Sequence, residues 1–132
     1  MKKKILIVVA DYYKDIASNL INSAKLYLKN KSSLSINFVR VPGVFEIPVT
    51  ISKNIKKYDA FISLGCVIKG ETPHFDFISK SVIDGIMNLS IEHKKPIGNG
   101  IITCLNKKQA LARRKKGKEA ARAVLSILNN FK

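Results

Sequence analysis

The sequence predicts an α/β protein in which a four-stranded parallel sheet lies between two layers of helices. Four short apolar runs, rich in β-branched residues, alternate with stretches where apolar residues recur at helical spacing. Two of these runs are apolar at nearly every position, which is typical of strands buried on both faces of a parallel sheet. Because connections between parallel strands are right-handed, the intervening helices should cover both faces.

The first half of the chain supplies two strands and two helices. The first strand is predicted at residues 4–10, KILIVVA, and a helix at about residues 15–30. The apolar face of this helix consists of Ile16, Leu20, Ala24 and Tyr27. The second strand is predicted at about residues 35–41, and it runs into a glycine turn. Pro48 fits the first turn of a second helix that reaches about residue 56.

Two more strands and three helices follow. The third strand is predicted at residues 60–68, and a long helix at about residues 75–93. The fourth strand is predicted at residues 97–104, and Asn106 is expected to cap a short helix that reaches Arg113.

The last helix is predicted after a break at Gly117. Its apolar positions are Ala121, Val124, Leu125 and Leu128. The resulting order of elements is βαβαβαβαα. With right-handed crossovers, this order predicts a flavodoxin-like three-layer α/β/α sandwich.

The composition indicates one domain, residues 1–132, with a substantial core, because 46% of the residues are hydrophobic. The apolar run at residues 5–10 is too short for a signal peptide core or a membrane span. Cys66 and Cys104 lie in strand-like runs, without the CxxC spacing of a redox pair. We therefore expect two buried free thiols and a cytoplasmic protein without a membrane partner.

The chain is strongly basic, with 24 Lys and Arg against 9 Asp and Glu and a net charge of +15. Such an excess often marks a polyanionic partner. Most of the lysines are scattered over predicted helix surfaces without aromatic neighbours, which argues against a nucleic-acid partner. Only the cluster at residues 113–118 is dense enough to count as a local feature, and the simplest explanation for it is a solvated helix end.

The predicted fold brings four loops to the edge of the sheet where the strands end. They are residues 11–13, 42–46 and 69–74 and the segment after Thr103. Ligands of open α/β sheets bind at this edge. Together the loops offer aromatic rings, a carboxylate, a turn that suits an anion, a histidine and a basic cluster. They contain neither a metal-ligand constellation nor a GxxxxGK[ST] phosphate loop, so we expect no metal, no cofactor and no nucleotide triphosphatase.

The loop after the third strand contains the most residues that could bind a ligand or transfer a proton. Gly70 lets the backbone approach a ligand closely, Thr72 offers a hydroxyl, and His74 can take up and release a proton near neutral pH. Simpler explanations exist as well, because Thr72 can open the helix and His74 can be a solvated first-turn residue. For Phe45 and Glu46, core packing and a favourable first-turn carboxylate are the corresponding alternatives. The complementary content of the loops favours a binding site.

Three motifs stand in order along the chain: VPGVFEIP at 41–48, LGCVIKGETPHFD at 64–76, and QALAR at 109–113 followed by KGKEAA at 116–121. In content, order and spacing they resemble the lumazine synthase (6,7-dimethyl-8-ribityllumazine synthase) family of riboflavin biosynthesis. The resemblance covers nearly the whole chain. Family members condense 5-amino-6-ribitylaminouracil with 3,4-dihydroxy-2-butanone 4-phosphate, with loss of phosphate and water, so the resemblance implies a transferase.

By resemblance, individual residues take roles in this reaction. The residues that match contacts to the pyrimidine and its ribityl chain are Tyr12, Val44, Phe45, Glu46, Val67, Ile68 and Asn99. Those that match phosphate contacts are Gly70, Glu71, Thr72, Arg113 and Lys116. His74 matches the proton-transfer histidine of the family. The resemblance implies that Tyr12 stacks on the pyrimidine, that Glu46 accepts hydrogen bonds from the ribityl hydroxyls, and that Arg113 clamps the phosphate.

The chain departs from the family pattern in two places. Asn99 stands where many members have an aromatic residue, so this wall of the site, which the neighbouring subunit contributes in the family, should be more polar. The segment between Arg113 and Gly117 is shorter than in the family, so Arg114 or Lys115 could serve in place of Lys116. Members form homopentamers, some of which assemble into sixty-subunit shells, and the resemblance leaves the assembly size open.

Three functions differ in the residues that they require. The enzyme is favoured, with small-molecule substrates as its partners. A flavodoxin-like binder of phosphate or flavin without catalysis would need no histidine beside the anion turn. A nucleic-acid-binding protein would show aromatic residues and arginines interleaved along one face, which the sequence does not predict.

Overall fold

The computed structural model describes residues 2–31, 33–71 and 73–129. The elements along the chain are β1 (Lys3–Ala10), α1 (Lys14–Leu28), β2 (Leu34–Val41), the 3-10 helix η1 (Val44–Glu46), α2 (Ile47–Asn54), β3 (Ala60–Ile68), α3 (Phe75–His93), β4 (Ile97–Cys104), α4 (Lys107–Ala112) and α5 (Lys116–Leu128). The predicted order of strands and helices is confirmed. In the described ranges, no helix has the length and apolarity that a membrane crossing requires.

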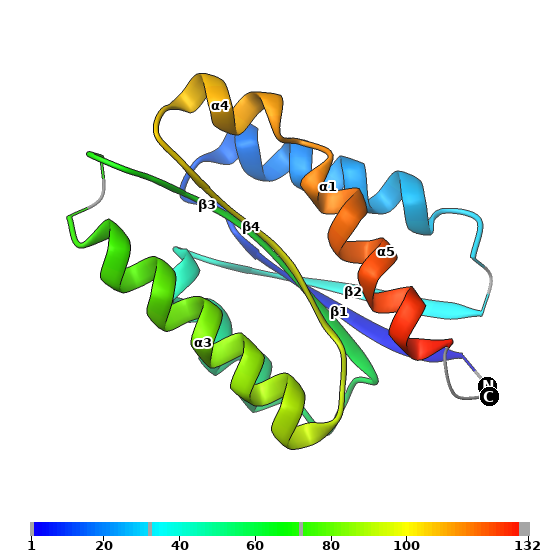
Figure 1. Ribbon diagram of the computed structural model, residues 1–132. Coiled ribbons are helices and arrows are strands. Elements are labelled where there is room, and N and C mark those ends of the chain that lie inside the picture. Colours follow the sequence, from blue (N-terminus) through cyan, green and yellow to red (C-terminus); the bar gives the residue numbers. More distant parts are fainter. Residues whose placement is uncertain (1, 32, 72, 130–132) are drawn as a thin grey trace.

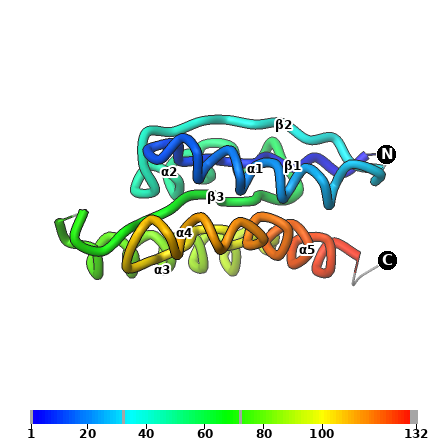
Figure 2. Tube along the Cα trace, turned by 90° about the horizontal axis from the view of Figure 1, so that it is seen from above, coloured from blue at the N-terminus to red at the C-terminus, as the bar shows by residue number. Residues whose placement is uncertain are grey.

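The four strands form one parallel sheet in the order β2-β1-β3-β4. Figure 1 shows α3 on one face of this sheet and α1, α4 and α5 on the other. In Figure 2, turned by 90°, β2 lies at one outer edge and α4 and α5 lie toward the opposite one. The α2 helix packs with α3 on its face of the sheet. This arrangement confirms the predicted α/β three-layer sandwich.

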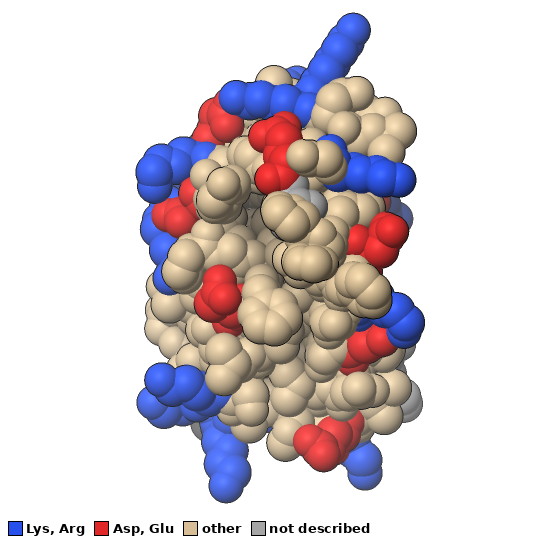
Figure 3. Space-filling view, turned by 90° about the vertical axis from the view of Figure 1, so that its left-hand side faces the viewer, with Lys and Arg blue, Asp and Glu red and all other residues tan. Residues whose placement is uncertain are grey.

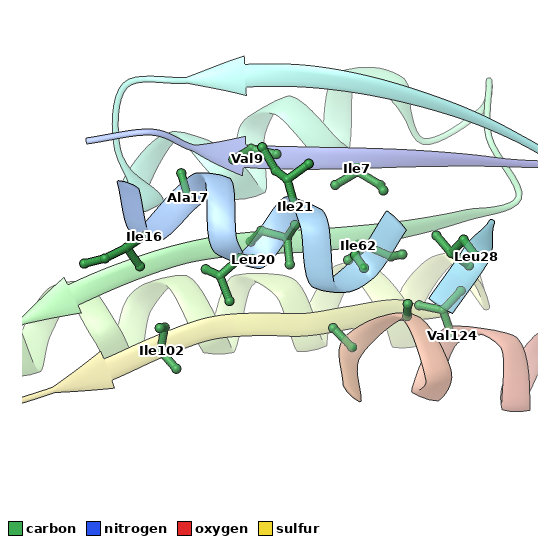
Figure 4. Packing of buried hydrophobic residues seen from close by; sticks show 14 of the residues in the cluster. Ile7, Val9, Ile16, Ala17, Leu20, Ile21, Leu28, Ile62, Ile102 and Val124 are labelled. Carbon is green, nitrogen blue, oxygen red and sulfur yellow. The ribbon is translucent and has the colours of Figure 1, made fainter. Parts of the chain in front are cut away.

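Two apolar clusters fill the space between the sheet and its helical layers. Alternate residues of β1 and β3 contribute to the cluster under α1 and α5, and most of the residues between them contribute to the cluster under α2 and α3. Figure 4 shows the first cluster, with Leu20 and Ile21 of α1 over Ile7, Val9 and Ile62 of the sheet. Because helices cover both faces, these strands are apolar at nearly every position, as their sequence pattern predicted.

The start of α5 differs from the prediction. The expected break at Gly117 is wrong, because α5 begins at Lys116 and the turn between α4 and α5 occupies residues 113–115. A Cβ at position 117 would lie 2.2 Å from the carbonyl oxygen of Leu20 in α1. Gly117 is therefore a contact point at which the backbone of α5 packs directly on α1.

Substitution of Gly117 with alanine should destabilise the fold by about 1–3 kcal/mol, because the methyl group forces α5 away from α1. The matched control is Gly85→Ala in α3, where the added Cβ would meet Pro48 at 3.4 Å, an ordinary contact. That substitution should be neutral or slightly stabilising through helix propensity. Urea unfolding midpoints of the two variants measure the difference, and equal stability of Gly117→Ala and wild type would contradict the packing argument.

Candidate functional site

The carboxyl ends of the strands and the loops after them form a cavity of about 230 Å³, here named the edge cavity. Its described lining residues are Tyr12, Tyr13, Gly43, Val44, Phe45, Cys66, Val67, Glu71, Pro73 and Ile78. Figure 3 looks onto this edge of the sheet, where acidic and basic side chains surround a largely uncharged middle. The predicted site residues that lie together here are Tyr12, Val44, Phe45, Val67 and Glu71.

Two tyrosines stand directly after β1. Strand pairing continues to Asp11, whose amide donates to the carbonyl oxygen of Val41 at 3.1 Å. The chain then turns into α1, and the rings of Tyr12 and Tyr13 meet edge to face with centroids 4.9 Å apart. Tyr12 is 71% exposed, so most of its ring surface is open to a ligand. This geometry suits stacking on a flat ring.

Glu46 holds the turn after β2 together. Its amide donates to the carbonyl oxygen of Gly43 at 3.2 Å, and the Thr50 hydroxyl donates to its carbonyl oxygen at 2.8 Å. The Glu46 carboxylate lies over Gly43, with Oε1 3.2 Å from the position that a Cβ would take. Since Gly43 lines the edge cavity, the half-buried Glu46 stands beside the cavity, and the 63% exposed Phe45 lines it directly.

The end of β3 supplies residues to the cavity from both faces of the sheet. Val67 reaches it from the α2 and α3 side, and Cys66 reaches it from the α1 and α5 side. The Ile68 side chain is buried in the cluster under α1 and α5, so Ile68 can contribute to the site only through its backbone. Cys66 is half-buried, contrary to the prediction, because it lines the cavity, whereas Cys104 is buried as predicted.

Burial raises the pKa of the Cys66 thiol to about 12 from its ordinary 9.0, and the nearby Cys104 adds to the rise. Since the thiolate is the reactive form of cysteine, Cys66 is a neutral lining group at physiological pH and not a nucleophile. The folded chain holds this proton more tightly than the unfolded chain does. The stability that the thiol contributes is therefore complete below about pH 9 and is lost as the pH rises toward 12.

A Cys66→Ala variant should accordingly lose less stability than wild type when the pH is raised from about 8 to about 10.5. The change removes the group whose proton affinity differs between the folded and unfolded states. Urea unfolding at the two pH values measures the loss in each protein. Parallel losses in wild type and variant would contradict the assigned shift.

The turn after β3 leaves room for an anion. The amide of Lys69 donates to the carbonyl oxygen of Cys104 at 2.9 Å, which ties the turn to the end of β4. Gly70 has a φ of 89°, in the region that favours glycine, and no atom lies within 4 Å of the position its Cβ would take. Open space beside a glycine lets an anion approach the backbone. Glu71 lines the cavity, and Thr72 falls outside the described residues.

His74 begins α3 in a left-handed conformation, with φ 64° and ψ 31°. This region is sparsely populated by residues other than glycine, and such strain concentrates at functional sites. The His74 carbonyl oxygen accepts from the amide of Ile78 at 2.9 Å, and its ring centroid lies 6.3 Å from that of Phe77. The side chain is exposed, and His74 directly follows Pro73, a lining residue, along the chain.

Arg113 is fixed at the end of β4. Its Nη1 donates to the carbonyl oxygen of Thr103 at 3.0 Å and lies 3.8 Å from Sγ of Cys104. The α4 helix that leads to it is capped as predicted, because the Asn106 side chain accepts from the amide of Gln109 at 2.9 Å. The guanidinium thus lies at the same edge of the sheet as the cavity, although it is not among the described residues that line it.

The other members of the basic cluster are not among the described residues that line the edge cavity. Nζ of Lys116 lies 4.0 Å from the carboxylate of Glu119 and does not line the cavity. Arg114 and Lys115, the open alternatives to Lys116, line a separate groove against α1.

Asn99 lies in the amino-terminal half of β4, opposite Ser63 in the strand register. Its Oδ1 accepts from the amide of Ile101 at 3.1 Å, and its side chain is exposed. It is not brought to the edge cavity of its own chain. Asn99 can therefore contribute to such a cavity only from a neighbouring copy.

Half of the described residues that line the edge cavity were not predicted from the sequence as site residues. They are Tyr13, Gly43, Cys66, Pro73 and Ile78. The first four are sequence neighbours of predicted site residues, and this adjacency is the signal that could have identified them. Ile78 lies within the helix predicted at residues 75–93, away from any strand end, so no such signal was available for it.

Comparison with known proteins agrees with these observations. The family model for 6,7-dimethyl-8-ribityllumazine synthase matches residues 2–132. A 6,7-dimethyl-8-ribityllumazine synthase 1 of Rhodopseudomonas palustris is 42% identical, over 95% of this chain and 83% of its own length. The 6,7-dimethyl-8-ribityllumazine synthase of Agrobacterium fabrum is 39% identical, over 96% of this chain and 93% of its own. The chain therefore belongs to the 6,7-dimethyl-8-ribityllumazine synthase family, the transferases of riboflavin biosynthesis.

Proposed function

We propose that the edge cavity is where this chain condenses 5-amino-6-ribitylaminouracil with 3,4-dihydroxy-2-butanone 4-phosphate. The observation that carries this proposal is the convergence of aromatic, apolar and polar groups on one opening, with the Gly70 turn and His74 beside it. The reaction needs a flat contact for a uracil ring, polar partners for a polyol, an anion site and a proton carrier. The site belongs to a single domain of 132 residues.

The pyrimidine substrate lies between apolar and aromatic groups. The exposed rings of Tyr12 and Phe45 supply large flat contacts, and the buried Val44 and Val67 form an apolar floor. The carboxylate of Glu46, beside the cavity, accepts hydrogen bonds from the ribityl hydroxyls. A charged acceptor is preferred here because an apolar wall would leave the hydroxyls without partners.

The phosphate of the second substrate binds at the turn that contains Gly70, Glu71 and Thr72, with Arg113 as its clamp and Lys116 as a second cation. The open space at Gly70 supports the position of the phosphate. The bond from Arg113 to the carbonyl oxygen of Thr103 supports a guanidinium held at the end of β4. A planar guanidinium can donate two parallel hydrogen bonds to a phosphate.

His74 moves protons in this reaction. When an amine of the uracil attacks the ketone carbonyl, a proton must pass from nitrogen to oxygen before water can leave. The imidazole of His74, one residue beyond the lining residue Pro73, can accept and return such a proton. The strained backbone at His74 is consistent with a residue that is held in place for a function.

The chain acts as a cytoplasmic homopentamer, in which Asn99 of one copy completes the cavity of the next. One observation supports the assembly and a second supports the compartment. Large apolar side chains are exposed along α3, among them Phe77 at 75% and Ile91 at 67%, and monomers rarely expose broad apolar patches. Cys66 and Cys104 are free thiols, as expected in a reducing compartment. Sedimentation velocity separates a pentamer from a sixty-subunit shell.

Mixing the chain with both substrates tests the proposed function. The expected result is a fluorescent lumazine whose formation requires both substrates. The alternative function is that of a flavodoxin-like binder of phosphate or flavin without catalysis. That function would give ligand binding without any product, and this outcome would overturn the proposal.

Substitution of Glu46 with glutamine should weaken binding of the pyrimidine substrate by about 1–2 kcal/mol per hydrogen bond, because the amide keeps the size of the side chain and loses its charge. Calorimetric titration with the pyrimidine measures the change. Glu92→Gln at the far end of α3 is the matched control, and its affinity should equal that of wild type. Equal affinity of Glu46→Gln and wild type would remove Glu46 from the ribityl site.

A further inference from the structure

A second hollow lies on the α1 and α5 side of the sheet and has no role in the proposed reaction. It has a volume of about 620 Å³ and is here named the α1 groove. Its described lining residues are Asn19, Asn22, Ser23, Leu26, Tyr27, Asn30, Lys31, Arg114, Lys115 and Lys118. The volume lies within the range of small-molecule sites.

The α1 groove gathers the part of the basic cluster that the edge cavity does not use. Arg114, Lys115 and Lys118 face α1 here, and Lys31 joins them from the end of α1. None of the described lining residues is an Asp or a Glu. The groove therefore presents four cations without an internal counter-charge, and an anion of several charges is the complementary ligand.

The framework that carries these cations is fixed. The backbone of α5 packs directly on α1 at Gly117, where no side chain fits. The amide of Lys118 donates to the Ser23 hydroxyl at 2.9 Å, which joins the two helices within the groove itself. The backbone that carries the cations of the α4–α5 corner is thus held against α1, which lowers the part of the ordering cost that comes from the backbone when a ligand binds.

The remaining lining groups are uncharged hydrogen-bonding side chains and one aromatic ring. The amides of Asn19, Asn22 and Asn30 can both donate and accept. The ring of Tyr27 already lies under the ammonium of Lys31, with Nζ 4.7 Å from its centroid. The groove follows α1 from Asn19 to the end of the helix at Leu28, about 14 Å, which is a short track with a single aromatic residue. These features favour a small anion over a nucleic-acid strand, which would need several stacking platforms.

We propose that the α1 groove is a binding site for a small polyphosphate anion, that is, a chain of adjacent phosphates. Four cations match the roughly fourfold negative charge of a triphosphate. The chain of phosphates can come from a nucleoside triphosphate or from inorganic tripolyphosphate. In the first case the asparagine amides also bond to the edges of the base.

Calorimetric titration at about 0.15 M salt tests the proposal with tripolyphosphate, ATP and orthophosphate as separate probes. Tripolyphosphate should bind to one site per chain, and orthophosphate should not displace it. The triple variant R114Q, K115Q, K118Q should bind it about tenfold more weakly or worse. The matched control K53Q, K56Q, K57Q removes the same charge from exposed positions on and after α2, and it should bind as wild type does. Tighter binding of ATP than of tripolyphosphate identifies the nucleotide as the source.

Three results would overturn the proposal. Equal weakening by both triple variants would show a general effect of net charge. Displacement of tripolyphosphate by orthophosphate, or its loss in Arg113→Lys, would place the anion at the edge cavity. Affinity that rises with the length of a single-stranded oligonucleotide, with no saturable binding of tripolyphosphate, would indicate a nucleic-acid surface.

Discussion

Replacement of His74 with asparagine is expected to slow lumazine formation by about two to four orders of magnitude and to leave the affinity for the pyrimidine substrate nearly unchanged. Asparagine tolerates the left-handed backbone at this position, where φ is 64°, so the fold and the start of α3 should be preserved. What the variant loses is a side chain that can exchange a proton. Because the uracil amine is itself a nucleophile, the loss can fall at the low end of this range.

The control for this experiment lies at the other end of the same helix. Lys94 also has a positive φ, 55°, and caps α3 at its carboxyl end. Lys94→Asn therefore changes a similar backbone position far from the edge cavity and should turn over as wild type does. Steady-state kinetics with each substrate varied in turn gives kcat and KM. Unchanged kcat in His74→Asn would show that His74 is only a solvated residue at the start of the helix.

The second large effect is expected at Arg113. Arg113→Lys keeps the formal charge but loses the planar fork of donors, so the KM for 3,4-dihydroxy-2-butanone 4-phosphate should rise sharply, about ten- to hundredfold. The KM for the pyrimidine should change little, because the proposed contacts of that substrate are Tyr12, Phe45 and Glu46 and do not include Arg113. The guanidinium can donate to the carbonyl oxygen of Thr103 through Nη1 and still offer its other N–H groups to a phosphate, whereas a lysine ammonium lacks this planar set of donors.

Substitutions of the neighbouring cations serve as the comparison for Arg113→Lys. Arg114→Ala and Lys115→Ala should have much smaller effects on this KM, because both side chains face the α1 groove. Inorganic phosphate gives an independent readout, since it should compete with the butanone phosphate and raise the Tm of wild type by mass action. Undiminished protection of Arg113→Lys by phosphate, together with loss of protection in Lys115→Ala, would move the clamp into the basic cluster.

The architecture could be predicted from local patterns alone. The run KILIVVA and the run at residues 60–68 are apolar at nearly every position because helices cover both faces of β1 and β3, and that burial is visible in the sequence. The start of α5 could not be predicted in this way. Gly117 resembles a helix breaker in sequence, and only its contact with Leu20, far away along the chain, explains its place inside a helix.

The candidate site was predictable to the extent that it lies at strand ends. Tyr12, Phe45 and Val67 follow or end strands and converge on the cavity. Alternation along β3 places Cys66 and Ile68 on the same face, but it could not predict that Cys66 lines the cavity and Ile68 does not, because the cavity takes residues from both faces at the end of the sheet. Which basic residues lie near the edge cavity and which line the α1 groove also depends on the short turn between α4 and α5. No local sequence pattern encodes the geometry of this turn.

A crystal structure of the chain with 5-amino-6-ribitylaminouracil and inorganic phosphate tests the central claim most directly. The uracil ring is expected against Tyr12 and Phe45, the ribityl chain against Glu46, and the phosphate beside Gly70 with the Arg113 guanidinium of the same or a neighbouring copy. A pyrimidine bound away from the edge cavity, or a phosphate held by Lys115 in place of Arg113, would contradict the account.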